Sequence, residues 1–137
     1  MRRTDTTPKP QGLRILVVGE SGPGSELISS LLEFQGHEVR IAQDALDAIR
    51  LAFEFVPHVA FIDLQVVTKN EFELPRALRS LHEARNCKFI VTAGGVGSHD
   101  LRALKRAGLS HLLRRPINLE SVARAVDEAN APPFLLS

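Results

Sequence analysis

A run of four apolar residues that ends in an acid, Val59 to Asp63, constrains the fold of this chain more than any other stretch. An uninterrupted apolar run is typical of a strand that is covered on both faces, as in a parallel sheet flanked by helices. Asp63 then emerges at the carboxyl edge of the sheet, where open α/β folds bind their ligands. Two interpretations stay open: a functional carboxylate, or a side chain that caps the strand and accepts a loop amide.

Strand-like and helix-like patterns alternate along the rest of the sequence. The predicted strands are 13–18, 38–42, 59–62, 88–92 and 111–114. Each is followed by apolar residues at helical spacing, except that a loop over 65–71 is expected before the third helix. The predicted helix caps and stops are Gly36, Asp44, Ser98, Gly108 and Asn118. Five strands alternating with five helices predict an α/β fold, a five-stranded parallel sheet with helices on both faces.

Length and composition set the outer limits of the interpretation. The 137 residues suit one domain over 12–130, with a polar flexible leader at 1–11 and a short tail at 131–137. A formal charge of +1 argues against a positive electrostatic potential over the whole protein of the kind that attracts nucleic acid. The single cysteine, Cys87, excludes an internal disulfide and fits a cytoplasmic protein. No apolar run reaches the ~20 residues that a membrane span requires.

The order and spacing of four short segments resemble the receiver domains of two-component response regulators. The segments are Val17–Glu20, Phe61–Asp63, Ala107–Gly108 and Arg115–Pro116, and the resemblance covers about 13–129. It implies a flavodoxin-like (βα)5 receiver fold. It also implies a phosphoacceptor signalling domain, rather than an enzyme, whose partner is a histidine kinase or a phosphotransfer protein in a phosphorelay.

The resemblance assigns roles to three residues around the acidic site. Asp63 corresponds to the phosphoacceptor, and Glu20 to the acid that directly binds magnesium. Gln65 would offer its backbone carbonyl to the same ion. Gly19 stands where the family has a further acid, so one of three carboxylates is missing. Because Mg²⁺ requires hard oxygen ligands and charge compensation, its binding is expected to be weakened and the phosphoryl chemistry impaired.

Three further positions of the family pattern are altered. Ala93 falls on the position of a phosphoryl-bonding Thr or Ser, and Thr92 is expected to point elsewhere because side chains alternate along a strand, unless a bulge shifts it. Arg115 replaces a lysine, keeping the charge and adding a fork of donors for the phosphoryl group. Leu112 falls where an aromatic or histidine switch residue is common.

Positive charge gathers on one predicted side of the domain, formed by the fourth helix, fifth strand and fifth helix. The residues are Arg102, Lys105, Arg106, Arg114 and Arg124. Such charges are often only a solvated face, but receivers use this side to dimerise or to bind partners. An acidic protein partner or a homodimer is expected rather than nucleic acid, since no recognition motif or aromatic platform accompanies the charges.

Two other site classes are weaker candidates. The segment Gly19–Ser25 has the glycine spacing of a phosphate-binding loop but lacks its lysine. The five histidines show no close metal-ligand spacing. Two functions therefore stay open: a receiver that accepts a phosphoryl group on Asp63 with impaired Mg²⁺-dependent chemistry, or a pseudo-receiver that binds partners without phosphorylation.

Overall fold

The computed structural model describes residues 12–19, 23–69, 73–81, 86–93, 98–109, 111–114 and 116–130. It contains one five-stranded parallel sheet in the order β2-β1-β3-β4-β5. The strands are β1 (Arg14–Val18), β2 (Glu38–Ala42), β3 (Val59–Asp63), β4 (Lys88–Ala93) and β5 (Leu112–Arg114). The predicted sheet is confirmed. The predicted leader and tail lie outside the described residues.

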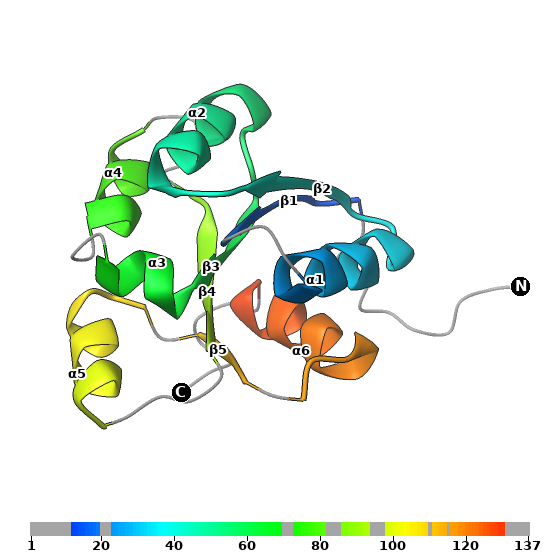
Figure 1. Cartoon of the computed structure of the whole chain (residues 1–137). Coiled ribbons are helices and arrows are strands. Elements are labelled where there is room, and N and C mark those ends of the chain that lie inside the picture. The colour runs from blue at the N-terminus through cyan, green and yellow to red at the C-terminus, as the bar shows by residue number, and fades with distance from the viewer. Residues whose placement is uncertain are drawn as a thin grey trace, which may run out of the picture.

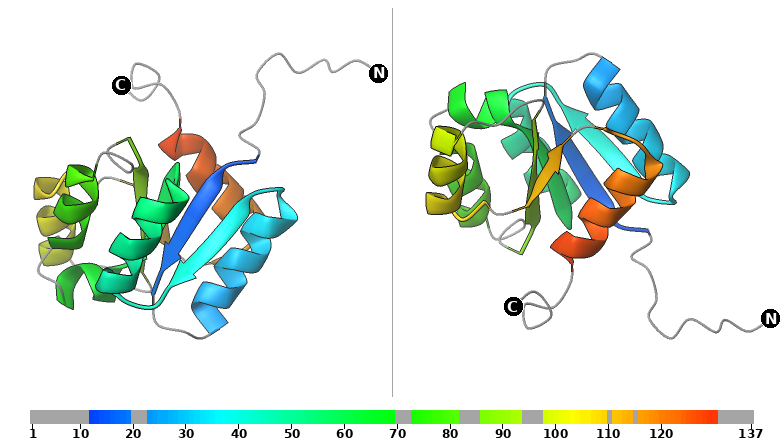
Figure 2. Two further views of the ribbon diagram at one scale, coloured as in Figure 1. Left: turned by 90° about the horizontal axis from the view of Figure 1, so that it is seen from above. Right: turned by 90° about the horizontal axis from the view of Figure 1, so that it is seen from below.

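Helices cover both faces of the sheet (Figure 1). Two helices pack on one face, α1 (Pro23–Phe34) and α6 (Leu119–Ala129). On the other face lie α2 (Ala45–Phe55), α3 (Leu64–Lys69), α4 (Glu73–Ser80) and α5 (Ser98–Arg106). Figure 2 shows the same three layers from above and from below the view of Figure 1. This is the doubly wound arrangement that alternating strands and helices predict.

The core consists of two layers because neighbouring residues of a strand point to opposite faces of the sheet. In β3, Phe61 packs toward α1 and α6, whereas Ala60 and Ile62 pack toward α2, α4 and α5. The side chain of Phe61 is only 1% exposed. Burial on both faces explains why the β3 sequence is continuously apolar until Asp63.

Most predicted helix boundaries are confirmed by their local hydrogen bonds. Asp44 caps α2 by accepting the Asp47 N–H, and Asn118 forms a capping box with Ser121 at the start of α6. Gly36 and Gly108 follow α1 and α5 with positive φ angles, as glycine after a helix commonly does. Helix α2 ends instead on Val56, whose φ of 53° is costly for a β-branched residue.

The expected loop at 65–71 is wrong over its first part, because helix α3 begins directly after β3. The Asp63 carboxylate accepts the Gln65 N–H at 2.8 Å, and so supplies the acceptor that the first turn of a helix needs. Val67, which falls within the expected loop, is fully buried against the sheet. The burial of one valine and the capping by Asp63 stabilise this short helix.

In the part of the chain that the structure describes, none of the helices has the length and apolar character to cross a bilayer.

Candidate functional site

Asp63 is the last residue of β3 and is partly exposed at the carboxyl edge of the sheet. In the order of strands, β3 lies between β1 and β4, so the site is flanked by both of their ends. One carboxylate oxygen, Oδ1, accepts the Gln65 N–H at 2.8 Å. Asp63 therefore does have a structural role, as the acceptor of a backbone N–H, which the sequence analysis left open. The exposure of Asp63 leaves its carboxylate accessible to a ligand as well.

Gly19 follows β1 and lies directly beside Asp63. A Cβ atom at this glycine would lie 3.5 Å from Asp63 Cβ, 3.7 Å from its Oδ2 and 3.1 Å from Ser25 Oγ. The side chain that is missing at Gly19 would thus have stood against the Asp63 carboxylate. The sequence prediction that an acid is absent from the neighbourhood of Asp63 agrees with this geometry.

Thr92, and not Ala93, is the register partner of Asp63. The strands β3 and β4 pair without a bulge from Val59 opposite Lys88 to Asp63 opposite Thr92. Paired residues of parallel strands point to the same face, so Thr92 shares the face of Asp63, and Ala93 belongs to the opposite face. The expectation that Thr92 points elsewhere is corrected. The error followed from assigning the family's Thr or Ser position to Ala93, since side-chain alternation then placed Thr92 on the opposite face.

A cavity of about 510 Å³ opens beside Asp63, between the start of α2 and the short helix α3. Asp44 and Lys69 contribute charged groups to its wall, and Leu46 and Val66 contribute apolar ones. The sequence analysis did not assign Asp44 or Lys69 to the site. The sequence carried no usable signal for Lys69, because its spacing of four residues from Gln65 places the two on one side only within a helix, and a loop was expected there.

The described oxygen donors do not by themselves form a magnesium site. Gln65 turns its N–H toward Asp63, and its carbonyl accepts a hydrogen bond from Thr68 Oγ1 at 3.4 Å within α3. Among the described residues, no three histidine, cysteine or acidic side chains are grouped as metal ligands. Glu20, which the resemblance assigns to the metal, lies outside those residues.

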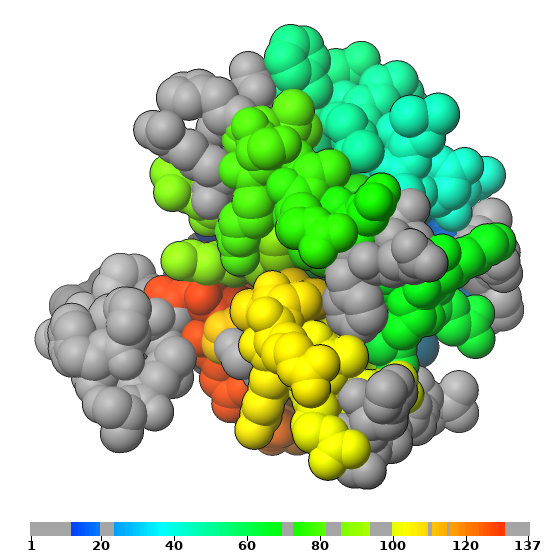
Figure 3. All heavy atoms as spheres, turned by 90° about the vertical axis from the view of Figure 1, so that its left-hand side faces the viewer, coloured from blue at the N-terminus to red at the C-terminus, as the bar shows by residue number. Residues whose placement is uncertain are grey.

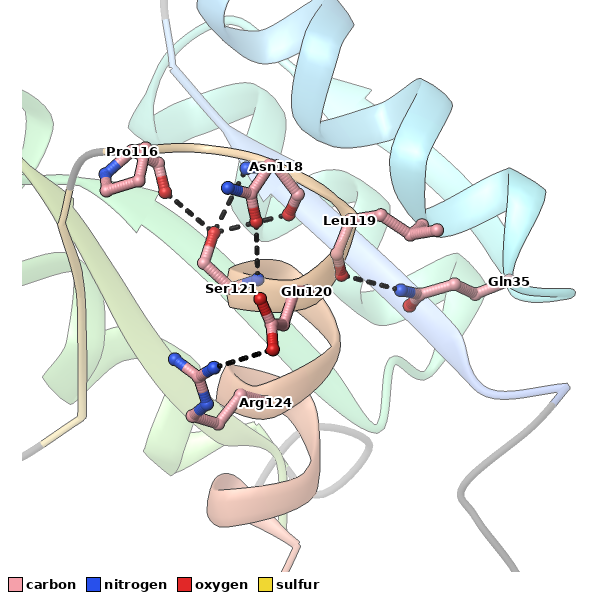
Figure 4. A network of polar contacts seen from close by, with 7 residues as sticks. All are labelled: Gln35, Pro116, Asn118, Leu119, Glu120, Ser121 and Arg124. Carbon is pink, nitrogen blue, oxygen red and sulfur yellow. Dashed lines mark hydrogen bonds and ion pairs between the residues drawn. The ribbon is translucent and has the colours of Figure 1, made fainter.

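The switch position of the resemblance, Leu112, is the first residue of β5, and its arginine, Arg115, follows that strand in sequence. Leu112 is partly buried and packs against the core layer of α2, α4 and α5. Arg115 lies outside the described residues. The residues from Pro116 onward are held by a polar network at the start of α6 (Figure 4). Ser121 Oγ donates to the Pro116 carbonyl at 2.8 Å, and Gln35, directly after α1, donates to the Leu119 carbonyl at 3.1 Å.

The predicted basic side of the domain is exposed in the structure. Arg102, Lys105 and Arg106 lie on the solvent side of α5, and Arg114 is exposed at the end of β5. In Figure 3 the yellow atoms of α5 stand at the surface between the green atoms of α3 and α4 and the orange-red atoms of α6. Arg124 of α6 forms an ion pair with Glu120 at 3.4 Å, so part of its charge is compensated.

Cys87 is buried just before β4. Burial raises the pKa of its thiol to about 12, so the reactive thiolate is not formed near neutral pH. The one cysteine of the chain is therefore unsuited to nucleophilic chemistry, and Asp63 is the better candidate for a reacting group.

Comparisons with known proteins agree with the geometry. No family model matches the chain. Protein PilH of Pseudomonas aeruginosa is 26% identical over 114 residues, which cover 83% of this chain and 94% of PilH. The virulence sensor protein BvgS of Bordetella bronchiseptica is 26% identical over 132 residues, and the chain spans 92% of its own length but 11% of that sensor.

Solved structures of receiver proteins resemble this one in overall fold. The chemotaxis response regulator CheY4 of Vibrio cholerae superposes with a TM-score of 0.75 at 20% identity, over 85% of this chain and 98% of CheY4. The strand order β2-β1-β3-β4-β5, the acid at the end of β3 and these likenesses lead to one conclusion. The chain therefore has the flavodoxin-like fold of CheY-like response regulator receiver domains.

Proposed function

We propose that this receiver domain accepts a phosphoryl group on Asp63 and that the transfer is slower than in receivers with a complete set of acids. The observation that carries the proposal is the arrangement of three positions on one face: Gly19 without a side chain, Asp63 beside it, and Thr92 paired with Asp63. The nucleophile, Asp63, and a hydroxyl donor, Thr92, are kept. The acid that would help to balance the charge of Mg²⁺ is missing at Gly19.

In the proposed reaction, a carboxylate oxygen of Asp63 attacks the phosphorus of a phosphohistidine on the donor protein. A bond forms between oxygen and phosphorus, and the bond between phosphorus and nitrogen breaks. Its electron pair stays on the imidazole, which takes up a proton. The product is an acyl phosphate. Thr92 supports the acceptor role because its hydroxyl is of the type that donates to a phosphoryl oxygen, and Arg115 would supply positive charge.

Magnesium, where receivers bind it, neutralises phosphoryl charge during the transfer. Gly19 argues for weak metal binding in this chain, because it removes one of the carboxylates that would stand beside Asp63. Gly19→Asp is therefore expected to increase phosphorylation and its dependence on Mg²⁺. The new Cβ would lie 3.1 Å from Ser25 Oγ, so the serine must move by a few tenths of an ångström.

The direct test incubates the full chain with acetyl phosphate and Mg²⁺ and follows its intact mass. A gain of one phosphoryl group is expected, and Asp63→Asn should lose it completely, because an amide is not a nucleophile here. Asp44→Asn is the matched control: it removes a neighbouring acid of the same cavity and should keep the mass gain. No mass gain in the wild type, or an equal gain in Asp63→Asn, would contradict the proposal.

A second candidate function is a pseudo-receiver, which binds partners without phosphorylation. It is favoured by the structural role of Asp63, whose carboxylate already caps α3 through the Gln65 N–H. Under this alternative the chain shows no mass gain, and Asp63→Asn binds its partner as the wild type does. Asparagine keeps an acceptor oxygen, so it preserves the cap while removing the nucleophile.

The exposed basic residues of α5 are the proposed docking surface for an acidic protein partner or for a second copy of the chain. Replacing both Arg102 and Lys105 by glutamate should weaken that association. Lys88→Glu at the start of β4 is a control that changes charge at an exposed position away from α5. Sedimentation of the free chain tests self-association, and unchanged self-association in the double variant would leave the homodimer on this surface without support.

A further inference from the structure

Two histidine side chains hold the amino end of β1, at the edge of the sheet opposite Asp63. The Leu13 N–H donates to His37 Nδ1 at 3.2 Å, and the Arg14 N–H donates to His58 Nδ1 at 2.9 Å. His37 directly precedes β2, and His58 directly precedes β3. Because β1 lies between β2 and β3, the two imidazoles reach it from both neighbouring strands.

Backbone hydrogen bonds complete each of these contacts. The Glu38 N–H donates to the Leu13 carbonyl at 2.9 Å, and the His58 N–H donates to the Arg14 carbonyl at 2.8 Å. Each imidazole nitrogen thus takes the place that a backbone carbonyl would take at the end of a strand ladder. Two consecutive amides at the start of β1 are satisfied in this way.

An imidazole Nδ1 accepts a hydrogen bond only while it carries no proton, so both contacts require the neutral ring with its proton on Nε2. Burial lowers the pKa of His37, and the nearby carboxylate of Asp127 on α6 opposes this change. Burial also lowers the pKa of His58, and the guanidinium of Arg14 lowers it further. The neutral ring is therefore the favoured form in the folded chain.

We propose that His37 and His58 form a proton-sensitive clamp on β1, closed while both rings are neutral and opened when acid protonates Nδ1. The folded-state pKa values lie below the unfolded value of 6.5. At pH values between the folded-state and unfolded-state pKa, the unfolded chain therefore binds more protons than the folded chain. The stability that the clamp contributes is complete above the unfolded value and is lost as the pH falls through the folded pKa values. Acidification would thus loosen the strand that leads to Gly19.

The first test observes the two rings and the two amides directly by NMR on the full chain. At about pH 7.5, long-range proton–nitrogen spectra should show Nε2-protonated tautomers for His37 and His58. As the pH is lowered from there until both rings are seen to be protonated, the Leu13 and Arg14 amides should lose protection from hydrogen exchange beyond the change in the intrinsic rate. Nδ1-protonated tautomers at about pH 7.5, or amide protection that persists once both rings are protonated, would overturn the clamp.

The second test compares melting temperatures at about pH 7.5 and at about pH 5.5. The wild type should lose several degrees on acidification, and His58→Asp should lose less, because a carboxylate still accepts the Arg14 N–H but stays ionised over this range. His111→Gln removes a histidine outside the clamp and should lose as much as the wild type. Equal losses in wild type and His58→Asp would refute the role of His58. The NMR test does not depend on the folding of any variant.

Discussion

The two edges of the sheet use polar side chains in opposite ways. At the amino edge, His37 and His58 accept backbone amides of β1, and the Arg14 guanidinium donates to the Val56 carbonyl at 2.8 Å. At the carboxyl edge, Asp63 stays partly exposed beside an open cavity, next to a glycine that provides no side chain. The same strands therefore end in a closed hydrogen-bonded seam on one side and in an accessible site on the other.

From this difference we expect substitutions at the amino edge to affect mainly folding stability, and substitutions at the carboxyl edge to affect mainly the proposed function. Buried polar groups need partners, so changes at the amino edge are expected to alter the free energy of unfolding. The groups of the carboxyl edge retain access to solvent, so their substitution should alter phosphoryl transfer with small effects on folding. The strand interiors connect the edges and should affect both.

Phe61→Ala is the largest expected change, because it removes packing that both edges share. The side chain is 1% exposed in the middle of β3. Its truncation should lower the free energy of unfolding by about 3–5 kcal/mol, measured by urea denaturation. Phe53→Ala is the control for the same substitution at a site that is 59% exposed, and it should cost about 0.5 kcal/mol or less. Similar costs for both would contradict the assigned core.

Thr92→Val tests the carboxyl edge alone. Valine keeps the shape and removes the hydroxyl, so phosphorylation by acetyl phosphate should slow about 10–100-fold, the size of one hydrogen bond to a charged group. The urea midpoint should change little. Ala93→Ser is the matched control at the neighbouring position, which has the opposite facing, and it should leave the rate unchanged. A faster reaction in Ala93→Ser would restore the assignment of Ala93 to the site.

Val56→Gly tests the amino edge alone and should stabilise the protein. Glycine relieves the strain of φ 53° at the end of α2, and this gain exceeds the added freedom of the unfolded chain by about 1 kcal/mol. Phosphorylation should be unaffected. Val66→Gly is the control inside α3, where glycine should instead destabilise by about 1 kcal/mol. Destabilisation by Val56→Gly would show that the valine conformation is not strained.

Arg14→Met has the smallest expected effect. Methionine keeps the apolar stem but removes the donor to the Val56 carbonyl, at a cost of about 0.5 kcal/mol. Combining it with Val56→Gly in a double-mutant cycle should reveal coupling, since the guanidinium helps to hold the left-handed residue. Strict additivity of the two urea-denaturation values would mean that the Arg14 side chain does not support this turn.

Local sequence pattern was enough for most of the fold. The apolar runs predicted all five strands, and the capping roles of Asp44 and Asn118 are confirmed because such hydrogen bonds join neighbours in sequence. Helix α3 was missed. Its six residues are too short for a helical pattern, and its stability comes from the burial of Val67 and from the Asp63 cap.

The candidate site was predictable only in part. Asp63 was visible because an acid after a buried strand is unusual, and the space beside Gly19 agrees with the predicted missing acid. The facing of Thr92 was predicted wrongly, because the family's Thr or Ser position was assigned to Ala93 and no local pattern fixes the register of β4 against β3. A shift of one residue exchanges the two faces of a strand.

The sequence by itself determined which segments become strands and helices, since apolar periodicity and caps act over a few residues. Only the tertiary structure decided which side chains meet. It paired Thr92 with Asp63, and it brought His37 and His58 to consecutive amides of β1. These contacts join residues that are distant along the chain. Strand order and register set them, and both depend on packing the whole sheet.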